Sequence, residues 1–101
     1  MGRWAQRQRG GGGGAGTNFI VSAHKSGVDT VEVTYQQAIA IGNLIADTFV
    51  SDPSNEVGTV LTQVSAKVIE VDFDINISTD TTLSYVGENP NVKHPQTVAY
   101  T

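Results

Sequence analysis

Hydrophobic and polar side chains alternate along several stretches of the chain, and this alternation predicts β-strands. In the clearest stretch, 67–77, five apolar side chains share one face: Ile69, Val71, Phe73, Ile75 and Ile77. Polar and acidic residues occupy most positions between them, on the opposite face. The stretch 30–35 alternates in the same way. One apolar and one polar face are typical of a strand that is half buried in an antiparallel sheet.

Four further stretches have strand patterns, at 18–24, 59–64, 82–86 and 96–100, and turn-forming residues separate them. In the first of these, Phe19, Val21 and Ala23 alternate with the residues between them. In 82–86, Leu83 and Tyr85 share a face. Together with a short extended piece in 35–50, these six stretches predict about seven short strands and an all-β, antiparallel β-sandwich.

The segment 35–50 fits two patterns, since its apolar residues match both a helical stripe and a short strand followed by a turn. Gly42 and Asn43 lie in the middle and weaken a continuous helix. We therefore expect short extended pieces here, with one helical turn near 44–47.

The first 16 residues, MGRWAQRQRGGGGGAG, differ from the rest in composition and charge. They contain Arg3, Arg7 and Arg9 and no acid, whereas residues 17–101 hold three lysines and all ten acids, a formal charge of −7. A run of glycines neither favours a helix nor packs a core. We therefore expect two parts, a flexible basic arm at 1–16 and a folded domain at 17–101.

Composition excludes several classes of protein. The chain has no cysteine, which rules out disulfides and a Cys-based zinc site. Residues 1–16 lack the apolar core of a signal peptide, and no segment approaches 18 uninterrupted apolar residues, so we expect no membrane partner. The acidic domain should repel nucleic acid, and three arginines in the arm would bind phosphates only weakly.

Candidate catalytic and metal-binding residues are few. Glu70, Asp72 and Asp74 form an acidic stripe that could contribute to a calcium site, although alternate residues of a strand lie about 7 Å apart. A solvated strand face explains the stripe better. His24 and His94 have no other ligands at metal-binding spacing, and we expect both on the surface. The sequence therefore predicts no catalytic residue, no metal and no cofactor, and hence no enzyme.

The arm holds the strongest candidates for binding a partner. Arg3, Arg7 and Arg9 can pair with carboxylates, and Trp4 offers a large apolar anchor. The run Gly10, Gly11, Gly12, Gly13 and Gly14 is interpreted as a linker, because it lacks the Lys-Ser/Thr of a phosphate-binding loop. The RQRGG segment resembles an RGG nucleic-acid segment, but a single copy favours docking on protein.

The domain resembles bacterial Ig-like domains of the kind repeated in large surface proteins. The resemblance lies in VEVTYQQAI at 31–39, ADTFV at 46–50, the long alternating strand at 67–77 and LSYVG at 83–87. It covers about 18–101 and implies an Ig-like β-sandwich. The combination of a basic, Gly-rich arm and one such module also resembles small virion proteins of tailed phages.

This second resemblance implies a function and a location. We expect a non-enzymatic structural protein of a phage virion, decorating or cementing the head or forming part of the neck or tail. Its partners would be capsid, portal or tail subunits in a symmetric assembly. A bacterial cell-surface adhesive module and a nucleic-acid-binding protein that uses the RGG-like arm are the alternatives.

Overall fold

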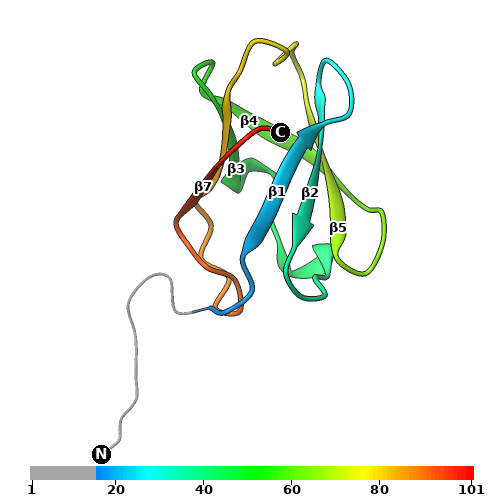
Figure 1. The fold of residues 1–101 in the computed structure, drawn as a ribbon, viewed down its shortest axis with the longest axis vertical. Coiled ribbons are helices and arrows are strands. Elements are labelled where there is room, and N and C mark those ends of the chain that lie inside the picture. The colour runs from blue at the N-terminus through cyan, green and yellow to red at the C-terminus, as the bar shows by residue number, and fades with distance from the viewer. Residues whose placement is uncertain (1–15) are drawn as a thin grey trace, which may run out of the picture.

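Seven antiparallel strands, with two short 3₁₀ turns, make up most of residues 16–101, the part of the chain that the computed structural model describes (Figure 1). The strands are β1 (Ile20–Lys25), β2 (Thr30–Tyr35), β3 (Phe49–Asp52), β4 (Glu56–Gln63), β5 (Val68–Phe73), β6 (Thr82–Tyr85) and β7 (Gln96–Ala99). The turns are η1 (Ile41–Asn43) and η2 (Ala46–Thr48). The prediction of an all-β fold is confirmed.

The strands form one nearly closed sheet in the order β1-β2-β5-β4-β3-β6-β7. Pairing is uneven, because β4 pairs with β5 at five positions but with β3 at only two. The first and last strands, β1 and β7, lie side by side, and parallel bridges join Asn18 to Val92 and Ala23 to Tyr100 (Figure 1). The body therefore presents little open sheet edge, the part of a β protein most prone to pair with other chains.

One side chain closes the seam between β1 and β7. The carboxamide of Gln96 accepts a hydrogen bond from the Ile20 backbone nitrogen at 2.9 Å and donates one to the Ile20 carbonyl at 2.8 Å. Further along the seam, the Thr101 nitrogen donates to the Ala23 carbonyl at 2.9 Å. Gln96 thus occupies the place that a neighbouring strand's backbone would take in a continuous ladder.

The core lies inside this nearly closed sheet and takes alternate residues from the strands. Phe49 of β3 packs against Tyr85 of β6 with ring centroids 5.1 Å apart, and both are fully buried. The other large side chains that are fully buried are Tyr35, Ile69, Ile77, Leu83, Val31, Val33, Val71 and Val92. Burial of this apolar surface is the main stabilising contribution to the fold.

The alternation predicted for 67–77 is confirmed only as far as Phe73. Ile69, Val71 and Phe73 are buried, but Ile75 is 45% exposed, so its prediction as an inward residue is wrong. After Phe73 the chain leaves the ladder and turns, and the Ile77 nitrogen donates to the Val28 carbonyl. Ile77 is then buried as a loop residue. Its alternation with Phe73 in the sequence is therefore not evidence of a continuous strand.

The strict alternation predicted for 18–24 is also wrong. A register shift between Ile20 and Ser22 places both Ile20 and Ala23 in the core, three residues apart. Phe19 and Val21, which share a face with Ala23 in the simple pattern, are exposed instead. A β-bulge of this kind adds one residue to one strand and so reverses the side chains beyond it.

The ambiguous segment 35–50 contains no helix longer than a 3₁₀ turn. Its two turns, η1 and η2, flank an extended pair, of which Leu44 is buried and Ile45 exposed. The prediction of short extended pieces is confirmed, but two helical turns replace the one expected at 44–47. The strand predicted at 59–64 begins earlier, at Glu56.

Candidate functional site

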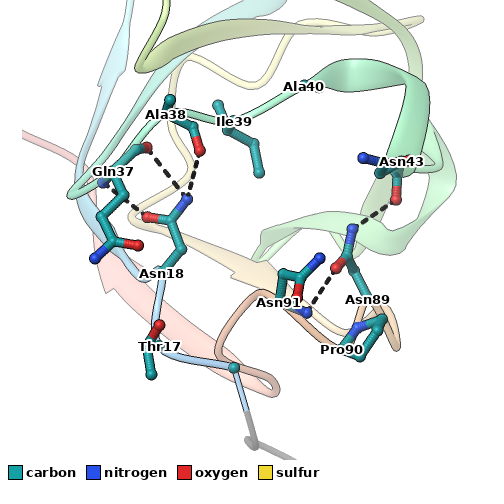
Figure 2. A pocket seen from close by; sticks show the side chains of 11 residues that line it. Thr17, Asn18, Gln37, Ala38, Ile39, Ala40, Asn43, Asn89, Pro90 and Asn91 are labelled. Carbon is teal, nitrogen blue, oxygen red and sulfur yellow. Dashed lines mark hydrogen bonds between the residues drawn. The ribbon is translucent and has the colours of Figure 1, made fainter.

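A polar pocket of about 530 Å³ opens at the end of the body where the described chain begins (Figure 2). Three segments line it, 16–18, 37–40 and 89–91, together with Asn43. Figure 2 shows Asn18 and Gln37 on one side and Asn43 and Asn89 on the other. The volume lies within the range of small-molecule sites.

Asn18 builds one wall of the pocket. Its buried side chain donates hydrogen bonds to the carbonyls of Gln37 and Ala38, both at 3.1 Å, and accepts one from the Gln37 nitrogen at 2.8 Å. Its backbone nitrogen donates to Asn91, and its carbonyl accepts from Lys93. One residue thus ties the start of the domain to both other segments.

Asn89 holds the opposite wall. Its side-chain amide donates to the Asn43 carbonyl at 2.8 Å, and its oxygen accepts from the Asn91 nitrogen at 2.8 Å. Its own backbone nitrogen donates to the Tyr85 hydroxyl at 3.2 Å. Because Tyr85 is a core residue, these bonds anchor the 87–91 loop to the interior.

Gly16, the first described residue, lies at the rim of this pocket. Gly16 lies so close to the backbone of Asn91 and Val92 that a methyl group in its place would overlap both. Only glycine fits such an approach without moving the backbone. The predicted arm residues Arg3, Trp4, Arg7 and Arg9 and the linker Gly10, Gly11, Gly12, Gly13 and Gly14 lie outside the described residues.

The acidic stripe lies partly on the outer face of β5. Glu70 and Asp72 are half buried there, whereas Asp74 lies beyond the end of the strand and is exposed. Glu32 of β2 pairs directly with Glu70 across the sheet. Within residues 16–101, no group of three His, Cys, Asp or Glu side chains could hold a metal ion, so the described residues offer no support for the calcium hypothesis.

The crowding of acids changes the titration of Glu70. A protonated Glu70 carboxyl donates a hydrogen bond to Asp72, and this bond, with burial and the charges of Asp72, Glu32 and Asp29, raises the pKa of Glu70. Because the pKa is higher in the folded state, the ionised form of Glu70 weakens the fold at neutral pH.

We expect Glu70→Gln to raise the free energy of unfolding at pH 7 by about 0.5 kcal/mol, since it removes repulsion on a face open to solvent. The gain in the free energy of unfolding should disappear as the pH falls below about 4.3, the pKa of an unfolded glutamate. Glu70 is then protonated in both the folded and the unfolded state, so it no longer carries a charge that weakens the fold. Urea unfolding at pH 7 and at pH 3.5 measures both effects. The exposed Glu88→Gln is the control, and a loss of stability in Glu70→Gln at pH 7 would contradict this account.

The two histidines are held by backbone carbonyls. His24 is exposed, as predicted, and its Nδ1 lies 3.1 Å from the Thr101 carbonyl oxygen. His94 is half buried, and its Nδ1 lies 2.7 Å from the Val92 carbonyl oxygen.

A buried polar cluster surrounds Asp80, a residue that the sequence pattern did not single out. Asp80 Oδ2 accepts hydrogen bonds from Ser51 Oγ at 2.6 Å and Ser54 Oγ at 2.5 Å, and Oδ1 accepts one from the Ser54 nitrogen at 3.1 Å. Ser51 Oγ also lies 2.7 Å from the Tyr100 hydroxyl. Lys25 Nζ donates to the carbonyls of Ser78 and Asp80. An aspartate in a Ser-Thr-Asp turn looks like a surface residue, so the sequence carried no signal for this cluster.

The balance of forces on Asp80 favours its charged form. Burial disfavours the charge, but the hydrogen bonds from Ser51 and Ser54 and the nearby Lys25 outweigh it and lower the pKa of Asp80. Asp80 is 4% exposed and Ser51 is fully buried. The cluster therefore fixes the 52–55 turn and the C terminus in place.

Comparisons of the chain with protein-family models, with curated proteins and with solved structures found no match. The Ig-like and phage resemblances therefore stay predictions. Within residues 16–101, no helix has the length and apolar character needed to cross a membrane.

Proposed function

We propose that this protein is a non-enzymatic structural component of a tailed-phage virion, anchored by its N-terminal arm. The observation that carries the proposal is the division of the chain at Gly16. Before it lies a cationic, acid-free segment with one tryptophan, and after it lies an acidic all-β body. A segment of this composition suits attachment to another protein better than packing against its own domain.

The junction supports this role. Gly16 packs against the backbone at 91–92, so the arm leaves the body from a defined point beside the pocket. A fixed exit point limits the positions that Trp4 and the arginines can reach. Such a limit raises their effective concentration near a docking groove.

The strand order supports an Ig-like sandwich. The strands β1-β2-β5-β4 and β3-β6-β7 follow the ABED and CFG order of constant-type Ig domains, with weak β3–β4 pairing at the boundary between the two groups. Phe49 of β3, the third strand, packs in the core where antibody domains carry tryptophan. The chain lacks the cysteine pair of antibody domains, and its one tryptophan is in the arm.

The arm would bind a groove on a capsid, portal or tail subunit. Arginine pairs with carboxylates through two parallel hydrogen bonds, and tryptophan is enriched at the centres of interfaces. Ordering a glycine-rich segment costs on the order of 1 kcal/mol per residue, so many contacts or a symmetric array must offset that loss.

Deleting residues 1–9 is expected to reduce the copies of this protein in purified phage particles at least tenfold. The variants are produced in cells that assemble the particles, and quantitative mass spectrometry of gradient-purified particles measures the copies. Trp4→Ala should give a smaller loss, and Asp74→Ala, at an exposed position of the body, should give none. Circular dichroism checks that each variant folds.

Two outcomes would overturn the proposal. If the full-length protein is absent from the particles, the virion assignment is wrong. If the deletion variant is incorporated normally, the arm is not the anchor. Affinity for duplex DNA that falls with a log-log salt slope of roughly −3, as three phosphate contacts predict, would favour the nucleic-acid alternative.

A further inference from the structure

Most backbone acceptors of the 37–40 and 89–91 walls are already used. In the 37–40 wall, the Asn18 side chain donates hydrogen bonds to the carbonyls of Gln37 and Ala38. The Gln63 side chain donates to the Ile39 carbonyl, and the Asn43 nitrogen donates to the Ala40 carbonyl. On the opposite side, the carbonyls of Asn43, Asn89 and Asn91 accept from Asn89 Nδ2, the Val92 nitrogen and the Asn18 nitrogen. An extended peptide, which binds by pairing with free backbone groups, therefore meets little to pair with.

Three side-chain carboxamides remain. Gln37, Asn43 and Asn91 are exposed and line the same pocket. Gln37 and Asn43 come from the connection between β2 and β3, and Asn91 comes from the connection between β6 and β7. The side-chain amides of these three residues form no hydrogen bond with any of the described residues. Figure 2 shows them around the pocket, with Ile39 as an apolar side chain between the two walls. Each carboxamide offers two donors and an acceptor, the combination that pairs with a hydroxyl group, which is itself both donor and acceptor.

The pocket is also free of charge. Residues 17–101 carry thirteen lysines and acids, yet none of them is among the residues that line it. An anionic or cationic ligand would lose its hydration without gaining a counter-charge. The lining therefore favours a neutral ligand.

We propose that this pocket binds a neutral saccharide through Gln37, Asn43 and Asn91. Asn18 and Asn89 act as positioning residues, because their side chains are committed to the walls and hold the three segments at a fixed separation. The site is open, and none of the residues of 16–101 that line it is aromatic, so affinity depends on the carboxamides. This inference is independent of the proposed virion role.

Titration of the ¹⁵N-labelled full-length protein with maltotriose, lactose and N,N′-diacetylchitobiose tests the site. At least one of these is expected to give saturable shifts in the side-chain amides of Gln37, Asn43 and Asn91. The double variant Gln37→Ala/Asn91→Ala should weaken that binding at least tenfold and keep the fold, since neither side chain has a structural partner in residues 16–101. Gln36→Ala is the matched control, because Gln36 is an exposed neighbour that does not line the pocket. The affinity of this variant for the saccharide should be unchanged.

Trigalacturonate and a pentaglycine peptide are titrated in parallel. Weaker binding of the acidic sugar supports a neutral site. The proposal is overturned if no neutral saccharide gives saturable shifts at the pocket, if pentaglycine binds there more tightly than the saccharides, or if the double variant binds as well as the unmodified protein.

Discussion

Replacing Asp80 by alanine is expected to lower the free energy of unfolding by about 3 kcal/mol, the largest effect of any single substitution considered. The change removes the acceptor of three hydrogen bonds at a site that is 4% exposed. Ser51 Oγ keeps the Tyr100 hydroxyl as a partner and Ser54 Oγ keeps the Ser51 carbonyl, but the Ser54 nitrogen loses its acceptor. A cavity adds to this loss.

The effect should depend on pH in a defined direction. Because the pKa of Asp80 is lower in the folded protein than in the unfolded chain, its contribution is complete above about pH 4. It is lost as the pH falls through the lower, folded-state value. The difference in the free energy of unfolding between the unmodified protein and Asp80→Ala should therefore decrease as the pH falls.

Urea unfolding between pH 2 and pH 7 measures this difference. The control is Asp74→Ala, because Asp74 is exposed and its loss should change stability by less than about 0.5 kcal/mol. Asp80→Asn keeps the shape of the side chain but loses one acceptor oxygen. Its free energy of unfolding should therefore lie between those of Asp80→Ala and Asp74→Ala. Equal stability of Asp80→Ala and the unmodified protein at pH 7 would show that the cluster does not stabilise the fold.

Gln96→Leu is expected to cost about 2 kcal/mol by opening the seam between β1 and β7. Leucine has nearly the same size but cannot bond to the Ile20 backbone, so a partly buried N–H and C=O lose their partner. The exposed sheet edge should also make the variant more prone to aggregate.

Hydrogen exchange and urea unfolding measure the two parts of this prediction. The Ile20 amide should exchange roughly 30-fold faster, the factor that corresponds to about 2 kcal/mol. Gln36→Leu, at an exposed glutamine, should change neither quantity by more than a few tenths of a kcal/mol. An Ile20 amide that exchanges at the unmodified rate in Gln96→Leu would mean that the Gln96 side chain does not hold the seam.

The local alternation of apolar and polar residues predicted the strands and much of the core. Val71 and Phe73, and then Leu83 and Tyr85, are buried as their alternation predicts, because adjacent residues of a strand face opposite sides of the sheet. The same rule failed at Ile75, where the strand had already ended. It failed again at Val21, because a bulge is a feature of pairing with the next strand.

The pocket could not be predicted from the sequence. Its walls come from three segments whose asparagines and glutamines look like ordinary loop residues. None of Gln37, Asn89 and Asn91 stands out in the sequence as a site residue, and the pattern around Asn43 indicates only a turn. These segments converge because the Asn18 side chain bonds to the carbonyls of Gln37 and Ala38, which lie 19 and 20 positions further along the chain.

The sequence alone determined that this protein is all-β, that residues 1–16 are basic and Gly-rich whereas residues 17–101 are acidic, and which side chains of its regular strands face inward. These properties depend on composition and on a two-residue period, which are local. Only the tertiary structure decided that Gln96 closes the sheet, that Asp80 is buried among serines, and that three carboxamides share a pocket. Each of these depends on hydrogen bonds between residues far apart in the chain, and a local pattern does not contain that information.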